Sequence, residues 1–335
     1  MKALRYISML GYILMSSMIP SSCDVHEFPD PTPKEMEFVL KLNYDTNLPL
    51  YKIVEYEEDT RNKVSEEYDV RHIIKVFEAE AEGAEARVEL YHFEFIEDDI
   101  TELNTTVTLS IIPGNYNFIV WSDYVKAGNH ASLHYDTNHF EEIALQGETH
   151  VGSDDFRDAF RGTVVSEVSD TTVEATVEMT RPMAKFNFVT TDVEDFIVKI
   201  TSEGITPSST NVDLTQYKAV FRYQGFMPFS YNMFTDKPAD SKTGVSFESS
   251  LHHLSNGEAE LGFDYVFVNG SESTMVVSVE IYDGQGNIVS NFKPVDVPLI
   301  RSKLTTVKAR FLTSDAMGGV SIIPDYDGEH NIEIN

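Results

Sequence analysis

Short segments in which apolar and polar residues alternate, separated by turn residues, recur along most of this chain of 335 residues. The clearest is Glu35–Tyr44, where apolar side chains take every second position from Met36 onward. Alternation with a period of two is typical of a β-strand with one buried face and one exposed face. We find no long helical periodicity and no repeat of fixed length. The pattern therefore predicts an all-β chain made of antiparallel β-sandwiches.

The remaining predicted strands fall into two groups on either side of Arg181-Pro182. We expect an N-terminal sandwich domain over residues 35–180 and a C-terminal one over residues 181–335. Asp123–Asp158 is rich in loop residues with room for a short helix, and Glu194–Ile200 is ambiguous. The predicted strands are Arg71–Glu78, Ala86–Phe95, Thr105–Ile112, Tyr116–Trp121 and Thr171–Met179, then Met183–Val189, Tyr217–Tyr223, Val245–Phe247, Gly262–Val268, Thr274–Tyr282, Asn287–Phe292 and Leu304–Leu312.

The N-terminus has the pattern of a secreted lipoprotein. Residues 1–22 carry a basic start, a short apolar stretch and small residues before Cys23, as in a signal peptide. The position of Cys23 predicts lipidation, with residues 23–34 as a proline-rich extended tether. Cleavage without lipid and a buried free thiol are the alternatives. Because Cys23 is the only cysteine, no disulfide can form within the chain.

The charge of the chain limits its partners. With 25 basic and 55 acidic residues the formal net charge is −30. Nucleic-acid binding needs a positive footprint, so this class of function is excluded. Anionic membrane surfaces also repel such a chain, so attachment to the outer membrane would depend on acyl chains at Cys23.

Signatures of catalysis or of cofactor binding are missing from the sequence. There is no nucleophile elbow, phosphate-binding loop, zinc-protease motif or dinucleotide fingerprint. We therefore expect no enzyme activity, no cofactor and no metal. His130, His134 and His139 form the densest histidine cluster. A metal site is the alternative there, and a polar surface loop is the interpretation we favour.

Three weaker patterns also have ordinary structural interpretations. Trp121 with Tyr124 is a conceivable sugar-stacking platform, but Trp121 ends an apolar strand, so a core position is favoured. In a chain this acidic, pairs such as Asp98-Asp99 and Asp154-Asp155 are expected by chance. Asp325–Gly328 lacks most of the ligands of a calcium loop and is interpreted as a turn.

Residues 314–335 form a tail with two short apolar segments. A terminal strand can add to the sheet edge of another subunit, or it can pair within its own domain, and the sequence leaves both open. The candidate donor residues are Val320, Ile322, Ile323, Ile332 and Ile334.

Several motifs together resemble the fimbrillin superfamily of Bacteroidetes-type bacteria, which comprises type V pilus subunits and their relatives. Arg181–Phe188 is similar to the opening of the family's second domain. Val297–Val307, with Phe311-Leu312-Thr313 after it, is similar to its late strand pair, although Ser302 replaces the usual Asn. Tyr223–Pro228 and Ile119–Tyr124 resemble the Mfa-like branch.

This resemblance implies two transthyretin-like β-sandwich domains and export as a lipoprotein. In stalk subunits of the family, an arginine-specific protease cuts the loop after the first strand, and a terminal strand of another subunit fills the vacated groove. Here the removable strand would be Glu35–Tyr44. The cut would follow Arg61 or, second, Arg71, which leads directly into a predicted strand. Anchor subunits keep their lipid and stay uncut.

The expected function is that of a fimbrial subunit or anchor at the cell surface that assembles by β-strand addition and acts in adhesion. Its partners would be other fimbrial subunits, the outer membrane through the lipid, and a receptor on a host or bacterial surface. The alternative is a surface glycan-binding lipoprotein that serves nutrient uptake.

Overall fold

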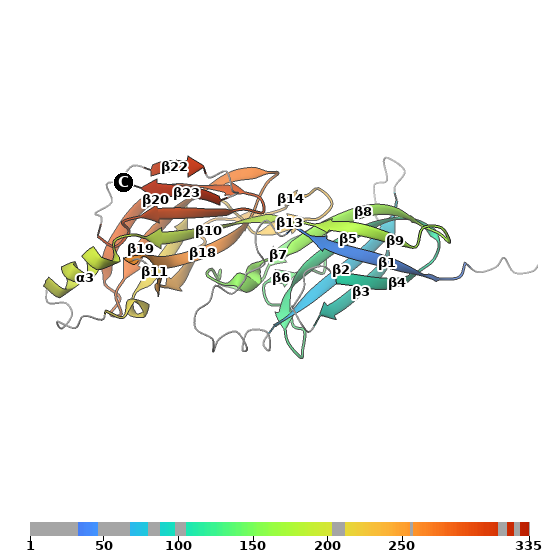
Figure 1. Cartoon of the computed structure of the whole chain (residues 1–335), viewed down its shortest axis with the longest axis horizontal. Coiled ribbons are helices and arrows are strands. Elements are labelled where there is room, and N and C mark those ends of the chain that lie inside the picture. Colours follow the sequence, from blue (N-terminus) through green and yellow to red (C-terminus); the bar gives the residue numbers. More distant parts are fainter. Residues whose placement is uncertain are drawn as a thin grey trace, which may run out of the picture. The chain divides into compact units, whose positions relative to one another are not determined.

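The computed structural model describes residues 33–45, 68–79, 88–97, 105–202, 212–254 and 257–313, together with the backbone of two strands in the tail (Figure 1). It confirms the all-β prediction, with stacked sheets of the sandwich type. The predictions for the signal peptide, Cys23, Arg61 and Asp98-Asp99 lie outside the described residues. Within them, no helix is long and apolar enough to cross a bilayer.

Two sheets enclose the core of the N-terminal half. One has the strand order β3-β2-β5-β8 and the other β4-β1-β9. Their inward side chains form one cluster, in which Phe38 and Leu40 of one sheet meet Ile74 and Phe118 of the other. The strands are β1 (Met36–Tyr44), β2 (Tyr68–Glu78), β3 (Glu89–Glu97), β4 (Thr105–Ile111), β5 (Gly114–Lys126), β8 (Phe160–Val168) and β9 (Glu174–Met179).

The C-terminal half is built in the same way. A six-stranded sheet in the order β17-β18-β10-β21-β23-β22 and a four-stranded sheet in the order β16-β11-β19-β20 share a core that includes Phe188, Phe221 and Phe311. The strands are β10 (Met183–Thr190), β11 (Lys218–Tyr223), β16 (Ser246–Ser250), β17 (His252–His253), β18 (Ala259–Phe267), β19 (Glu272–Tyr282), β20 (Ile288–Ile300), β21 (Leu304–Ala309), β22 (Val320–Pro324) and β23 (Glu329–Ile334).

Contacts between the halves are extensive. The C-terminal core cluster continues onto Ile73 and Trp121, which point away from the N-terminal core, and β7 pairs with β13. Residues Met36–Asn335 form one compact unit, and the domain division at Arg181-Pro182 stays a prediction. The minor elements are β6 (Tyr135–Asp136), β7 (Ile143–Leu145), β12 (Met227–Pro228), β13 (Ser230–Asn232), β14 (Lys237–Pro238), β15 (Ser241–Lys242), the 3-10 helices η1 (Asp155–Arg157) and η2 (Leu214–Gln216), and α3 (Val193–Ser202).

Most predicted strands are present. Besides the short strands β6, β7, β12–β15 and β17, which were not predicted, four differences stand out. β8 was not predicted, and the ambiguous segment Glu194–Ile200 lies in α3. β20 runs on through Pro294 and Pro298, which it tolerates because it is an edge strand paired only with β19. The sheets are not purely antiparallel, since β1 pairs in parallel with β9 and β10 with β21.

Candidate functional site

The N-terminal strand β1 lies between two strands that come much later in the chain. Its Met36–Leu42 segment pairs antiparallel with Ile111–Thr105 of β4. On its other side, Val39–Tyr44 pairs in parallel with Glu174–Met179 of β9. We call the space that β1 fills between β4 and β9 the β1 slot.

The inward face of β1 carries the apolar residues that the alternation predicted. Phe38 and Leu40 are fully buried, and Leu42 is 1% exposed. The Phe38 ring stacks on Phe118 of the opposite sheet, with 5.3 Å between ring centroids. Each inward side chain therefore fills its own apolar site on the floor of the β1 slot.

Tyr44 ends this row with a polar contact in an otherwise apolar setting. Its hydroxyl oxygen lies 3.0 Å from Nδ1 of His72 and donates to Oγ of Ser122, also at 3.0 Å. Its ring meets Phe160 edge-on at 5.0 Å. Burial raises the pKa of the Tyr44 phenol, so the hydroxyl stays protonated and able to donate. This contact fixes the register of β1, because a shift by one residue would turn Tyr44 to the outer face.

The outward face of β1 is polar. Lys41 forms an ion pair with Glu174 of β9 at 2.8 Å, and the Asn43 amide donates to Glu178 at 2.6 Å. Both partners of the ion pair are about half exposed, with side-chain exposures of 47% and 58%, so it contributes little to stability. Main-chain pairing on two sides and alternate apolar sites are the two features by which an extended segment is recognised in strand addition.

The second predicted cleavage residue, Arg71, lies within β2 and between β3 and β5. Its guanidinium donates to both carboxylate oxygens of Asp123, at 2.9 and 2.8 Å, and to Ser132. Arg71 is 5% exposed and Asp123 3%. The Arg71 peptide bond therefore lies inside a sheet, where a protease would reach it only after β2 had separated from its neighbours.

The backbone of the tail pairs within its own half. β23 runs parallel to β21, and β22 lies beside β23 at the edge of the six-stranded sheet. The sequence leaves open whether the tail pairs within its own domain or adds to another subunit, and the structure has it paired within its own chain. Donation of the tail to another subunit would require β22 and β23 to leave this edge.

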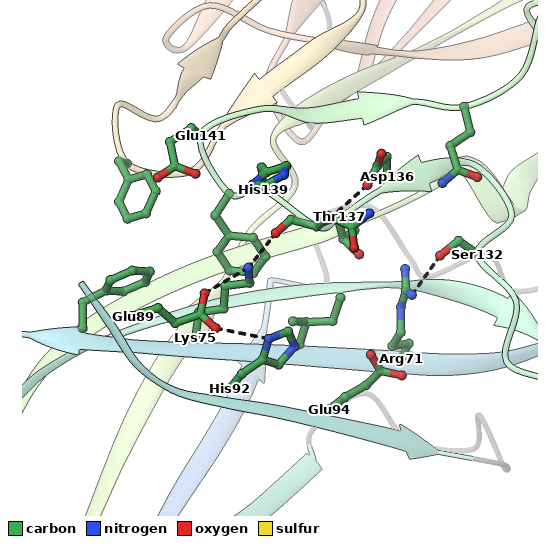
Figure 2. A pocket seen from close by; sticks show the side chains of 16 residues that line it. Arg71, Lys75, Glu89, His92, Glu94, Ser132, Asp136, Thr137, His139 and Glu141 are labelled. Carbon is green, nitrogen blue, oxygen red and sulfur yellow. Dashed lines mark hydrogen bonds and ion pairs between the residues drawn. The ribbon is translucent and has the colours of Figure 1, made fainter. Parts of the chain in front are cut away.

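A polar cleft of about 550 Å³ opens beside β2 and β3 (Figure 2). Lys75 lines it, forms an ion pair with Glu89 at 3.1 Å and donates a hydrogen bond to the Asn138 carbonyl at 2.8 Å. Glu94 and Glu141 line it as well. The sequence did not point to this cleft, because its lining comes from strands and loops far apart in the chain.

The three clustered histidines do not converge. His130 lies near Asp69 at 3.7 Å, His134 pairs with Asp154 at 3.1 Å, and His139 lines the polar cleft. No group of three potential metal ligands occurs among the described residues. Trp121 is fully buried and meets Tyr135 edge-on at 5.2 Å, which confirms its core position.

A buried charged network joins the two halves around Asp264 of β18. Asp264 accepts hydrogen bonds from Arg157 and Tyr223, and His150 lies 2.6 Å from it. Burial alone would raise the pKa of Asp264, but Arg157 and His150 outweigh that effect and hold the pKa below its ordinary value. Arg181, at the predicted domain boundary, is 1% exposed and binds Asp158 at 2.9 Å.

Solved structures with similar chain traces come from Bacteroidetes. A candidate polysaccharide-binding protein from Bacteroides thetaiotaomicron has 13% identity and a TM-score of 0.45, covering 78% of this chain and 80% of its own. A candidate cell-adhesion protein from Bacteroides uniformis has 12% identity and a TM-score of 0.41, covering 91% and 98%. A fimbrial assembly protein from Parabacteroides distasonis has 11% identity and a TM-score of 0.37, covering 82% and 90%.

Curated protein sequences give no match to this chain. A family model matches residues 31–335. The match therefore begins near the end of the predicted tether and covers all of the sequence after it. The chain thus belongs to the family of unknown function DUF6562.

Proposed function

We propose that this protein is a fimbrial subunit or pilus anchor that is exported as a lipoprotein on Cys23, assembles by β-strand addition and acts in adhesion at the cell surface. The observation that carries the proposal is β1. It is the first strand that the structure describes, it is paired on both sides, and its alternate apolar side chains close the N-terminal core. A segment built in this way can be replaced by another extended segment of matching pattern.

The chain has the parts that such an exchange needs. Arg61 follows β1 in the sequence, so one cut after it separates the strand from the rest of the protein. Among the described strands, β4 and β9 pair only with β1, so its loss would leave both without a strand partner and would expose the floor of the β1 slot to water. Unpaired strand edges beside an apolar groove favour association with another strand. The tail residues Val320, Ile322, Ile323, Ile332 and Ile334 are the proposed source of that strand.

The test is controlled cleavage of the exported protein with an arginine-specific protease. We expect a new N-terminus at Asn62, loss of β1 and oligomers that resist SDS. An Arg61→Lys variant should stay intact and monomeric under the same treatment, and a variant lacking residues 314–335 should be cut but fail to polymerise. If the cleaved protein keeps β1 bound and remains a monomer, assembly by strand addition is wrong, and an uncut lipidated anchor is the remaining form of the proposal.

The polar cleft favours a second candidate function, that of a surface glycan-binding lipoprotein. Its lining combines carboxylates with the half-buried ring of Phe234, and sugars are bound by hydrogen bonds to such groups together with contacts to an aromatic ring. Calorimetry with defined oligosaccharides tests this function. Binding that is lost in Glu94→Gln and kept in the exposed control Glu37→Gln would support it, and absence of binding across the set would reject it.

A further inference from the structure

Lys185 and Asp155 form a close lysine–carboxylate pair at the boundary between the halves. Nζ of Lys185, on β10, lies 2.6 Å from Oδ1 of Asp155, the first residue of η1. The side chains are only 12% and 18% exposed. The hydroxyl of Tyr265 donates to the same carboxylate oxygen at 3.2 Å. The amine and the carboxyl group are therefore held in contact by three separate elements.

The surroundings of this pair are largely aromatic. Nζ of Lys185 lies 3.9 Å from the centroid of the Phe263 ring and 5.1 Å from that of Tyr265. The pairing of β10 with β18 sets this arrangement, because Lys185 is opposite Tyr265 and Asn187 is opposite Phe263. Burial raises the pKa of Asp155, although Lys185 opposes the shift. The raised pKa of Asp155 favours its neutral carboxylic acid, which is the form whose Cγ an amine can attack.

A second carboxyl group belongs to the same cluster. Glu260 of β18 interacts electrostatically with both Lys185 and Asp155, and it is hydrogen-bonded to Asn187. Burial raises the pKa of Glu260 as well. Among the described residues, Oδ1 of Asn187 is buried and has no hydrogen-bond donor. The cluster thus adds a carboxyl group that interacts with both members of the pair, and an acceptor that is not yet used.

We propose that Lys185 and Asp155 join in an intramolecular isopeptide bond, with Glu260 moving the proton. The neutral amine of Lys185 attacks Cγ of Asp155, and the Nζ–Cγ bond forms. Glu260 takes a proton from the nitrogen and gives one to the departing hydroxyl. The Cγ–O bond then breaks and water leaves, with its oxygen from Asp155. No oxidant, metal or co-substrate is needed, and Glu260 is regenerated.

The bond would tie η1 covalently to β10, across a separation of 30 residues that includes Arg181-Pro182. Disulfides cannot provide such a link, because Cys23 is the only cysteine. The cluster also differs from an ordinary ion pair in the same half. Lys308 and Glu258 are 3.1 Å apart, but their side chains are 35% and 28% exposed, so water stabilises both ions. That pair is a matched control.

Intact-mass spectrometry of the full folded chain tests the proposal, independently of the fimbrial role. We expect the wild-type mass to be lower than the sequence mass by one water molecule, and a protease digest to contain a branched peptide that joins Lys185 to Asp155. Lys185→Arg should have the full sequence mass, and Lys308→Arg should still lose water. Glu260→Gln should slow the loss by roughly 100-fold or more, the usual contribution of a proton-transfer group.

Two results would overturn the proposal. One is a wild-type mass that equals the sequence mass after long incubation in the folded state. The other is loss of water that persists in Lys185→Arg, which would assign the reaction to other residues. If Lys185→Arg fails to fold, the branched peptide of the wild-type protein decides the question by itself, since its fragment masses identify both linked residues.

Discussion

Replacement of Phe38 by alanine should remove a large part of the energy that holds β1 in its slot. Phe38 is fully buried, and its ring is nearly parallel to that of Phe118, with an interplanar angle of 10°. Truncation of a buried phenylalanine costs about 3–5 kcal/mol, which includes the cavity that it leaves. A typical domain is stable by only about 5–15 kcal/mol, so the change should be visible without ambiguity.

Urea unfolding followed by fluorescence would measure this loss, with Glu37→Ala as the matched control. Glu37 is the next residue on the same strand but points outward and is exposed, so its replacement should alter stability by about 0.5 kcal/mol or less. A double-mutant cycle with Phe118→Ala should give a coupling of about 0.5–1.5 kcal/mol from the stacked pair. Equal destabilisation by Phe38→Ala and Glu37→Ala would refute the buried position of β1.

Three further predictions concern other parts of the fold. Arg71→Ala should destabilise the protein by about 3–5 kcal/mol because it leaves Asp123 buried without its partner. Lys41→Ala, which breaks an exposed ion pair, should cost at most about 1 kcal/mol. Thermal unfolding would compare the two variants, and equal shifts in melting temperature would contradict the buried pair. Because the folded-state pKa of Asp264 is depressed, its contribution to stability should be present above about pH 3.9 and be lost as pH falls through the folded-state pKa. Asp264→Asn should flatten that part of the pH profile of the unfolding free energy. An unchanged profile would argue against the pKa shift. Gly162→Ala should cost about 1–3 kcal/mol of stability because the added Cβ would lie 2.4 Å from Val177 of β9. Thr163 is exposed, so Thr163→Ala should be nearly neutral when both variants are compared by chemical denaturation. A neutral Gly162→Ala would show that β8 and β9 can move apart.

The sequence predicts a strand well where one face of the strand is exposed to water and the other is buried. β1 alternates cleanly because Phe38 and Leu40 face the core while Glu37 and Lys41 do not. β8 was not predicted because its sequence does not alternate clearly between apolar and polar residues. The apolar Val165 is 67% exposed, and Gly162, which has no side chain, takes a core-facing position. The helix α3 is only ten residues long, too short for its buried Val193, Phe196 and Ile200 to establish a helical period against a β-rich background.

The candidate sites depend on register and on tertiary contact, which local patterns do not contain. Lys185 was singled out only as part of a family motif, and Asp155 only as one of many acidic pairs. Their contact arises because η1 meets β10 while β18 brings Phe263 and Glu260 alongside. The parallel pairing of β1 with β9 is equally hidden, because alternation gives the buried face of a strand but not the direction of its neighbour.

That pairing has a consequence for how the chain acquires its structure. β1 emerges first during synthesis, yet its partners begin at Thr105 and end at Met179, so it stays without them until more than half of the chain exists. Contacts over such distances in sequence close late and slow the folding of β-proteins. Once β4 and β9 have been made, and until β1 pairs with them, the β1 slot is open to any extended segment of suitable pattern, including one from another copy. Self-folding and strand exchange between copies are therefore competing outcomes of the same late step, and the high local concentration of the tethered β1 favours self-folding.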